Sequence, residues 1–500
     1  MSALAGRSER SLLLYGGALL LAIVVGASMA YSERFGSDSG PYILLGVLLA
    51  IAVGVAILLQ WRIGAILLVA VLPLESVTYP GGFASGMKAL AAPVFISLAL
   101  ALLKDQKLFE KFARLWQQPL ALAVLAFVLW ISVSILWASD KGEALFATIQ
   151  FLGLLGLMVA VGLLERRYLL LAWAGLVFSA ALSVPAAYIL PLPEGSDMAV
   201  SGRFGPAGAG PNSYACLVAI AFFAAYFGLL RRHRMTAFLL APVLVYAIFA
   251  TASRTGLIAL VATPLLALFV PRLGARLGWR ILSMYVLGAA AIAVIVLAIS
   301  SVGETALERN MALSQLQSEG TWSGRWSNWQ GALDVTASHP ILGVGAGNYA
   351  EATLGHSEKN FAQSLDKGKV AGLAHNIFLS VASQLGIVGL ILWLGILFFL
   401  FKTAVPIGQR PGLGTGIFLG LIVAMIAGFT LTWESEKIVY VLFGSVLALQ
   451  LHFDSARRAP SSAEGEISAD KGVARASQPG QRRGRANGGQ LDANHGRGTV

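Results

Sequence analysis

Two arginines and one histidine in this chain have side chains suited to an anionic substrate and a hydroxyl acceptor. Arg254 lies in TASRTG, Arg325 in SGRWSNWQ and His375 in LAHNIF. Arginine carries a permanent charge on a planar set of donors that matches phosphate oxygens. A neutral imidazole can accept the proton of a hydroxyl group as that group attacks. These residue types predict a catalytic site that acts on a lipid-borne anionic substrate.

Arg254 separates two apolar stretches that are otherwise uncharged. An arginine costs about 2.5–3.5 kcal/mol at the centre of a membrane helix, and less near the interface, where its long side chain reaches water. An ordinary interfacial arginine is therefore one interpretation. The other is an anion site, because Thr255 and Gly256 open the next helix, and the N-terminus of a helix favours anions.

Arg325 lies in a polar insert, residues 301–374, within a chain that is otherwise almost wholly apolar. A stripe of apolar side chains at helical spacing runs along the start of this insert: Trp322, Trp326, Trp329 and Leu333. Tryptophan prefers the membrane interface, so the helix is expected to lie on the outer surface of the bilayer, with Arg325 and Asn328 at its edge. The stripe can equally be a plain anchor, with Arg325 bound to lipid phosphate.

His375 stands with Ala374 and Asn376 at the start of a long apolar helix. Two other histidines are expected outside the membrane, but His339 ends the tryptophan helix and His356 lies in a polar loop. A helix N-terminus should lower the pKa of His375 and favour the neutral form that a general base needs. A structural capping histidine is the alternative.

The composition identifies the class of protein that must position these residues. Hydrophobic residues make up 57% of the chain, charged residues 12%, and the mean hydropathy is +0.74. Such values lie far from those of soluble domains. The apolar runs are long enough to cross a bilayer as helices, and no alternating barrel pattern occurs. The sequence predicts an all-α, polytopic transmembrane helix bundle of about 12–14 spans with one large periplasmic loop.

Four regions follow from the distribution of these runs. They are a transmembrane bundle at 1–300, a periplasmic loop with an interfacial helix at 301–375, a second set of spans at 376–453, and a tail at 454–500. The tail is rich in Gly, Ser, Arg, Asn and Gln, so it is expected to be disordered. The third and fourth expected spans, 63–79 and 87–103, are the least regular, because Pro73, Glu75 and Lys88 interrupt or flank them. Other expected spans include 11–31, 42–60, 236–252, 255–270, 281–300 and 412–431.

Basic residues orient the bundle. Short loops such as RRHR at 231–234 and PRLGARLGWR at 271–280 alternate with loops that are nearly free of Lys and Arg. The positive-inside rule therefore places both termini in the cytoplasm and the insert in the periplasm. The net charge of +11 is spread over these loops. That distribution fits contact with membrane lipids and argues against a nucleic-acid partner.

Several segments resemble the O-antigen ligase and polymerase superfamily. They are SRTG at Ser253, GRWSNWQGALDVTASHPILGVGAGNY from Gly324 and AHNIFLSVASQLGIVGL from Ala374. The loop around AGAGPNSYA, which follows Arg203, is similar to an upstream Pro-Asn loop of that family. Arg203 is the one basic residue of its loop, and composition alone makes it a solvated turn residue. The likeness covers about residues 200–400, and its specificity lies in the order of the segments.

The resemblance implies an enzyme of the bacterial inner membrane. In that family a glycan is moved from undecaprenyl diphosphate at the periplasmic face, two arginines bind the diphosphate and a histidine acts on the acceptor. By position these are Arg254, Arg325 and His375, with Arg203, Asn328 and Asn376 as possible supporting residues. No cofactor is implied. The outer loops hold no Asp-x-Asp motif for a metal, so a metal-independent, inverting transfer is expected.

The resemblance leaves the acceptor open. A ligase uses lipid A-core, a polymerase uses a second lipid-linked glycan, and a protein glycosylase uses a serine or threonine. We favour the ligase. A flippase or another transporter is an alternative from a different class, although transporters place ionisable groups near the bilayer midplane, whereas these residues gather at one face. A passive scaffold would leave Arg254 unexplained.

Overall fold

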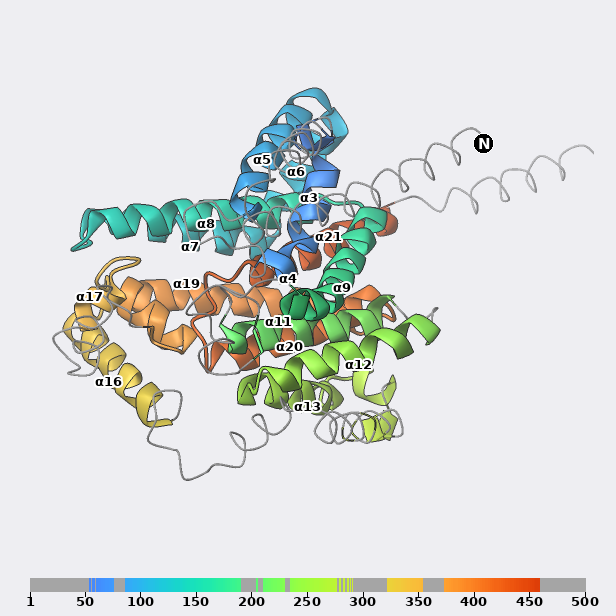
Figure 1. Ribbon diagram of the computed structural model, residues 1–500. Coiled ribbons are helices and arrows are strands. Elements are labelled where there is room, and N and C mark those ends of the chain that lie inside the picture. The colour runs from blue at the N-terminus through green and yellow to red at the C-terminus, as the bar shows by residue number, and fades with distance from the viewer. Residues whose placement is uncertain are drawn as a thin grey trace, which may run out of the picture. The chain divides into compact units, whose positions relative to one another are not determined.

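The computed structural model describes residues 60–75, 86–189, 210–229, 234–276, 322–353 and 373–458, with a few isolated positions between them. All regular elements in these ranges are helical, so the all-α prediction is confirmed (Figure 1). The described residues up to His452 belong to one compact unit, and of the second unit, residues 453–500, only the C-terminal end of α21 is described.

Six described helices are long and apolar enough to cross a membrane. They are α7 (Pro119–Val133) continued by the 3₁₀ turn η1 (Ser134–Leu136), α8 (Lys141–Gly162), α9 (Arg166–Ile189), α11 (Pro211–Phe223) continued by the π-helical turn η2 (Ala224–Leu229), α19 (Ile377–Gly408) and α21 (Lys437–Arg458). In lipid, only a closed set of backbone hydrogen bonds makes such segments stable, which is why they are helices. The chain is thus a multi-pass membrane protein.

Five shorter apolar helices coincide with further expected spans: α3 (Trp61–Ala70), α5 (Gly86–Lys104), α12 (Arg234–Ala250), α13 (Arg254–Leu268) and α20 (Leu413–Gly428). The expected span at 63–79 is broken, because α3 ends at Ala70 and α4 (Leu72–Glu75) follows. The spans expected at 11–31 and 42–60, and the one at 281–300, fall largely outside the described residues. The total of about 12–14 spans stays a prediction.

Small side chains let the helices that carry the site pack closely. α11, α12 and α13 lie side by side (Figure 1), and α20 packs against both α11 and α13. A Cβ atom on Gly256 would lie 2.5 Å from the Cβ of Ala215, so only glycine allows α13 to approach α11 this closely. Small residues serve the same purpose in membrane helices generally. The packing brings the starts of α11 and α13 together.

α19 is interrupted at Gly386, whose φ of 68° is left-handed. An interruption in a membrane helix leaves carbonyl groups that need partners from neighbouring elements. The three carbonyls before the break each accept a hydrogen bond: Ser383 from Val344 N at 3.1 Å, Gln384 from Gly345 N at 2.9 Å, and Leu385 from Trp130 Nε1 at 3.0 Å. The glycine-rich loop LGVGAGNY is therefore held against the break.

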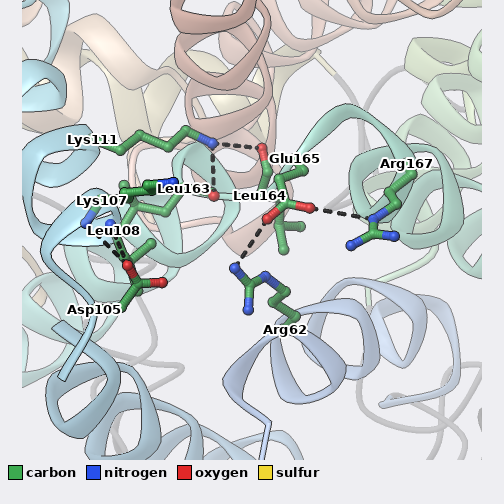
Figure 2. Close-up of polar contacts among 9 residues, drawn as sticks. All are labelled: Arg62, Asp105, Lys107, Leu108, Lys111, Leu163, Leu164, Glu165 and Arg167. Atoms are coloured by element: carbon green, nitrogen blue, oxygen red, sulfur yellow. Dashed lines mark hydrogen bonds and ion pairs between the residues drawn. The ribbon is translucent and has the colours of Figure 1, made fainter. Parts of the chain in front are cut away.

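A cluster of charged residues joins α3, α6 (Gln106–Trp116) and the α8–α9 junction (Figure 2). Glu165 pairs with Arg62 at 3.0 Å and with Arg167 at 3.3 Å. Lys111 Nζ donates to two carbonyls that follow α8, at 2.8 and 3.1 Å, and burial lowers the pKa of this lysine to about 8. α8 starts near the LGVGAGNY loop, because Asp140 N donates to Asn348 Oδ1 at 2.6 Å. The cluster thus lies at the other end of α8 from that loop.

Candidate functional site

Arg254 is the first residue of α13. Ser253 caps the helix, because its side chain accepts a hydrogen bond from Gly256 N at 3.2 Å. Ser253 and Thr255 are buried, whereas Arg254 is half-buried. The expected position of Arg254 beside a helix N-terminus is confirmed, and the backbone there favours a negatively charged ligand.

Arg325 lies in the first turn of α16 (Trp322–Ser338), and it too is half-buried. The tryptophan spacing predicted this helix, and the structure confirms it. Tyr349, in the short helix α17 (Tyr349–Thr353), donates from its hydroxyl group to the carbonyl of Asn328 at 2.8 Å. Tyr349 also packs in a small core with Ala332 and Ala374. This core joins the helix of Arg325 to the residue before His375.

The exposed side of α16 carries Trp326, which is 54% exposed, and Leu333, which is 52% exposed. Ala332 and Val335 form the side that is buried against the protein. The apolar stripe expected to face the membrane therefore lies, where its side chains are described, largely away from the core. An exposed stripe of this kind is what an interfacial helix presents to lipid.

His375 precedes α19 and has a left-handed backbone, with φ at 48°. Such a conformation is uncommon outside glycine and is kept only where neighbours enforce it. His375 N donates to Thr432 Oγ1 at 3.1 Å on one side, and on the other Asn376 caps α19 by accepting from the N–H groups of Phe378 and Leu379. The backbone of His375 is thus fixed at the start of α19, and the residue is half-buried there.

The three site residues affect one another electrostatically. Burial lowers the pKa of Arg325, and the charge of Arg254 lowers it further. Burial likewise lowers the pKa of His375, with the charge of Arg325 as the second cause. The lowered pKa that the sequence predicted for His375 is thus present, with burial as its first cause and the neighbouring cation as its second. Two cations held together are suited to a multiply charged anion, and a neutral imidazole beside them is suited to accept a proton.

The three residues predicted to support the site differ in what the structure shows of them. Asn376 is a structural cap whose Nδ2 also donates to Phe429 O at 3.3 Å. Asn328 takes part through its backbone carbonyl, as the partner of Tyr349. Arg203 lies outside the described residues.

The helices that carry the site residues are joined by a segment that the sequence analysis did not single out. This is residues 429–436, FTLTWESE, between α20 and α21. Its side chains contact the starts of three helices: Thr430 Oγ1 lies 2.9 Å from Thr255 Oγ1, Thr432 accepts from His375 N, and Trp433 Nε1 donates to Ser213 Oγ at 3.2 Å. The starts of α11, α13, α19 and α21 and the end of α20 therefore meet around this segment.

Glu434 is the buried carboxyl of that segment, with only 6% of its surface exposed. It accepts a short hydrogen bond from Ser380 Oγ, and Ser380 Oγ also accepts from Gln384 Nε2 at 2.9 Å. Burial raises the pKa of Glu434 to about 7, and Glu436 adds to the effect. The available signal in the sequence was two glutamates next to an apolar span, where ionisable groups are rare.

The LGVGAGNY loop is hydrogen-bonded to both the α7–α8 junction and α19. Asn348 is buried, accepts from Ser139 Oγ at 2.8 Å and donates to Asp140 O at 3.2 Å. Gly347 N donates to Gln384 Oε1 at 2.7 Å. The loop therefore connects the α7–α8 junction to α19 next to the Ser380–Glu434 pair.

Within the described ranges, no group of three or more His, Cys, Asp or Glu side chains is arranged to hold a metal ion.

Comparison with known proteins gives one family match. Residues 236–394 match the family model described as O-antigen ligase, and this range contains Arg254, Arg325 and His375. The resemblance to the O-antigen ligase and polymerase superfamily is therefore confirmed for that part of the chain. The comparison with curated proteins gives no match.

Proposed function

We propose that this chain, whose residues 236–394 match the O-antigen ligase family, is a membrane glycosyltransferase of the ligase type. It would move a glycan from undecaprenyl diphosphate to lipid A-core. The observation that carries the proposal is the electrostatic coupling of Arg254 to Arg325 and of Arg325 to His375. These residues come from three separate segments of the matched range.

Arg254 and Arg325 would bind the diphosphate. Their charges oppose each other in a half-buried setting, so a bound dianion relieves the repulsion and gains two charge-assisted sets of hydrogen bonds. In the transition state, negative charge grows on the leaving diphosphate, and the same donors stabilise it more strongly. The proposal therefore assigns charge stabilisation to arginine and needs no divalent metal.

His375 would act as the general base. Its lowered pKa keeps the imidazole neutral near pH 7, and the cation Arg325 contributes to that lowering. The acceptor oxygen attacks the anomeric carbon as the bond from that carbon to the diphosphate oxygen breaks. The hydroxyl proton passes to a ring nitrogen of His375, and undecaprenyl diphosphate leaves with the electron pair. One direct displacement inverts the anomeric centre.

The proposed place of the reaction is the periplasmic face of the bacterial inner membrane. The site gathers where α20 ends and α21 starts. At the other end of α20, near Thr415, Arg276 Nη2 donates to Thr415 Oγ1 at 3.1 Å. The basic residues assigned to the cytoplasm and the site residues therefore lie at opposite ends of one span, which supports this orientation.

The surface polysaccharide of a deletion strain tests the function. Loss of a ligase leaves full-length chains on undecaprenyl diphosphate and bare lipid A-core on a gel. Single repeat units on the core would instead indicate a polymerase, and unchanged lipopolysaccharide with lost glycoprotein would indicate a protein glycosylase. If lipid-linked glycan accumulated only in the inner leaflet, the chain would be a flippase and the proposal would be wrong.

A further inference from the structure

The 429–436 segment holds the residues of the site in place. Thr432 binds the backbone of His375, and Thr430 binds Thr255, the residue after Arg254. A displacement of this segment would therefore move the backbone of His375, whose left-handed φ depends on its neighbours. What fixes the segment also fixes the position of the imidazole.

Glu434 holds the 429–436 segment against α19. Its carboxyl group is buried and bonded to Ser380, in the first turns of α19, five residues after His375. The other carboxyl oxygen, Oε2, is buried without a hydrogen-bond partner among the described residues. Ser380 is in turn bonded to Gln384, which accepts from Gly347 N. The contact therefore joins the segment, α19 and the LGVGAGNY loop.

We propose that Glu434 is a positioning residue, which locks the 429–436 segment to the first turns of α19 and so sets the position of the His375 imidazole. Glu434 is not placed in contact with substrate. The inference deepens the proposed function, on which its activity measurements rest.

The electrostatics of the pocket favour a neutral lock. Among the described residues, those that act on the carboxyl group of Glu434 include Ser380 from α19, Glu436 from its own segment and Tyr440 from α21. None of them is a cation, and burial raises the pKa of Glu434 to about 7. A neutral carboxyl group forms a hydrogen bond with Ser380 without leaving a buried charge on Oε2. Above about pH 7 the group ionises. The hydrogen bond from Ser380 favours the charged form, but burial and the charge of Glu436 oppose it, and the buried charge weakens the lock.

The lock predicts a falling alkaline limb in the rate of transfer. As pH rises, the rate first increases while His375 loses its proton, which happens below pH 6.5 because its pKa is lower than the ordinary value of 6.5. It then decreases near pH 7 as Glu434 ionises. The pKa of Glu434 is raised from its ordinary value of 4.5 to about 7 in the folded protein. The protonated carboxyl group therefore contributes fully to stability below pH 4.5, and this contribution is lost as the pH rises from 4.5 to about 7.

Glu434→Gln and Glu434→Ala separate positioning from folding. Glutamine keeps the shape and hydrogen bonds of the neutral acid, so the variant should retain kcat at pH 6.5 and lose the alkaline limb. Alanine should lower kcat by about 10–10²-fold with unchanged donor binding, because the imidazole is misplaced. Ser380→Ala should lower kcat by a similar factor to Glu434→Ala, because it removes the same hydrogen bond. Ser383→Ala is the matched control, since Ser383 is a buried serine on the same helix whose hydroxyl group donates to carbonyls of its own helix.

A second readout does not require transfer. Diethyl pyrocarbonate modifies neutral imidazoles, and mass spectrometry of the full-length protein gives the rate at His375 relative to that at exposed His339. In Glu434→Ala this ratio should rise, and in Glu434→Gln it should match the unmutated protein. An unchanged ratio in Glu434→Ala would overturn the lock, as would an alkaline limb that persists in Glu434→Gln. Absence of transfer in the unmutated protein with the expected change in the ratio would overturn only the proposed function.

Discussion

At the scale of single residues, the proposed diphosphate site would depend on guanidinium geometry rather than on charge alone. Arg254 and Arg325 are each half-buried and close enough to lower the pKa of Arg325. Lysine offers a point charge in place of the planar fork and is more strongly hydrated. Arginine is therefore better suited than lysine to both positions of a site that holds two cations together near lipid.

Arg254→Lys and Arg325→Lys should each insert normally in the membrane and lose most transfer activity. The loss of a charge-assisted contact in the transition state costs about 1.5–3 kcal/mol, which is roughly a 10–150-fold decrease in kcat/KM. Arg276→Lys is the control at the opposite end of α20, and it should leave kcat/KM within a few fold. Near-normal transfer by both site variants at normal expression would contradict the diphosphate assignment.

The residues differ in how far the sequence predicted them. Arg254 and His375 stand out locally, as a charge beside a span and a histidine at a helix start. Arg325 stands out through the tryptophan-rich helix that carries it and through the family resemblance. Glu434 could not be assigned a role. Its importance comes from Ser380, which lies 54 positions away along the chain, and no local pattern encodes that contact.

At the scale of elements, the break in α19 explains the glycine-rich loop. The sequence predicted a long apolar helix after His375, and the LGVGAGNY glycines entered only as part of the family resemblance. The structure instead joins the two, because the loop supplies donors to the carbonyls before Gly386. The boundaries of the helices could be predicted from hydropathy and capping residues, whereas the break required the partner loop.

Gly386→Ala should destabilise the protein. Alanine is strained at a φ of 68°, and its Cβ atom would lie 2.1 Å from the carbonyl oxygen of Ile341. A left-handed non-glycine residue alone costs about 1–3 kcal/mol. The midpoint of thermal unfolding in detergent, at a fixed heating rate, should therefore fall by several degrees. Gly395→Ala, in the same helix with no atom within 4 Å of the added carbon, should leave the midpoint unchanged or raise it.

At the scale of the whole molecule, the chain separates its two kinds of basic residue. One kind, seen around Glu165 in Figure 2, pairs with carboxylates and helix ends at the face assigned to the cytoplasm. The other kind, Arg254 and Arg325, lies at the face that carries His375. The all-α class and the approximate positions of the described apolar helices could be predicted from composition and hydropathy. The contacts that bring the site segments together could not, because they are made between the ends of helices that are distant along the chain.

Reporter fusions test this orientation. Alkaline phosphatase inserted near Glu358 should be active, because the enzyme works only in the periplasm, whereas a fusion at Pro411, between α19 and α20, should be inactive. Green fluorescent protein after the tail should fluoresce in the cytoplasm. An inactive fusion near Glu358, at normal levels of the protein, would turn the site away from the outer leaflet and contradict the proposed reaction.

The most direct test of the central claim compares the unmutated enzyme with His375→Ala and His339→Ala in lipid vesicles. The assay supplies undecaprenyl-diphosphate-linked glycan and lipid A-core in a buffer that contains a metal chelator. We expect transfer with inversion by the unmutated enzyme and by His339→Ala, and release of undecaprenyl diphosphate in step with transfer. His375→Ala should bind the donor normally and transfer about 10²–10⁴-fold more slowly, the usual contribution of general-base catalysis. Near-normal transfer by His375→Ala, or transfer by the unmutated enzyme only after Mg²⁺ is added, would contradict the account.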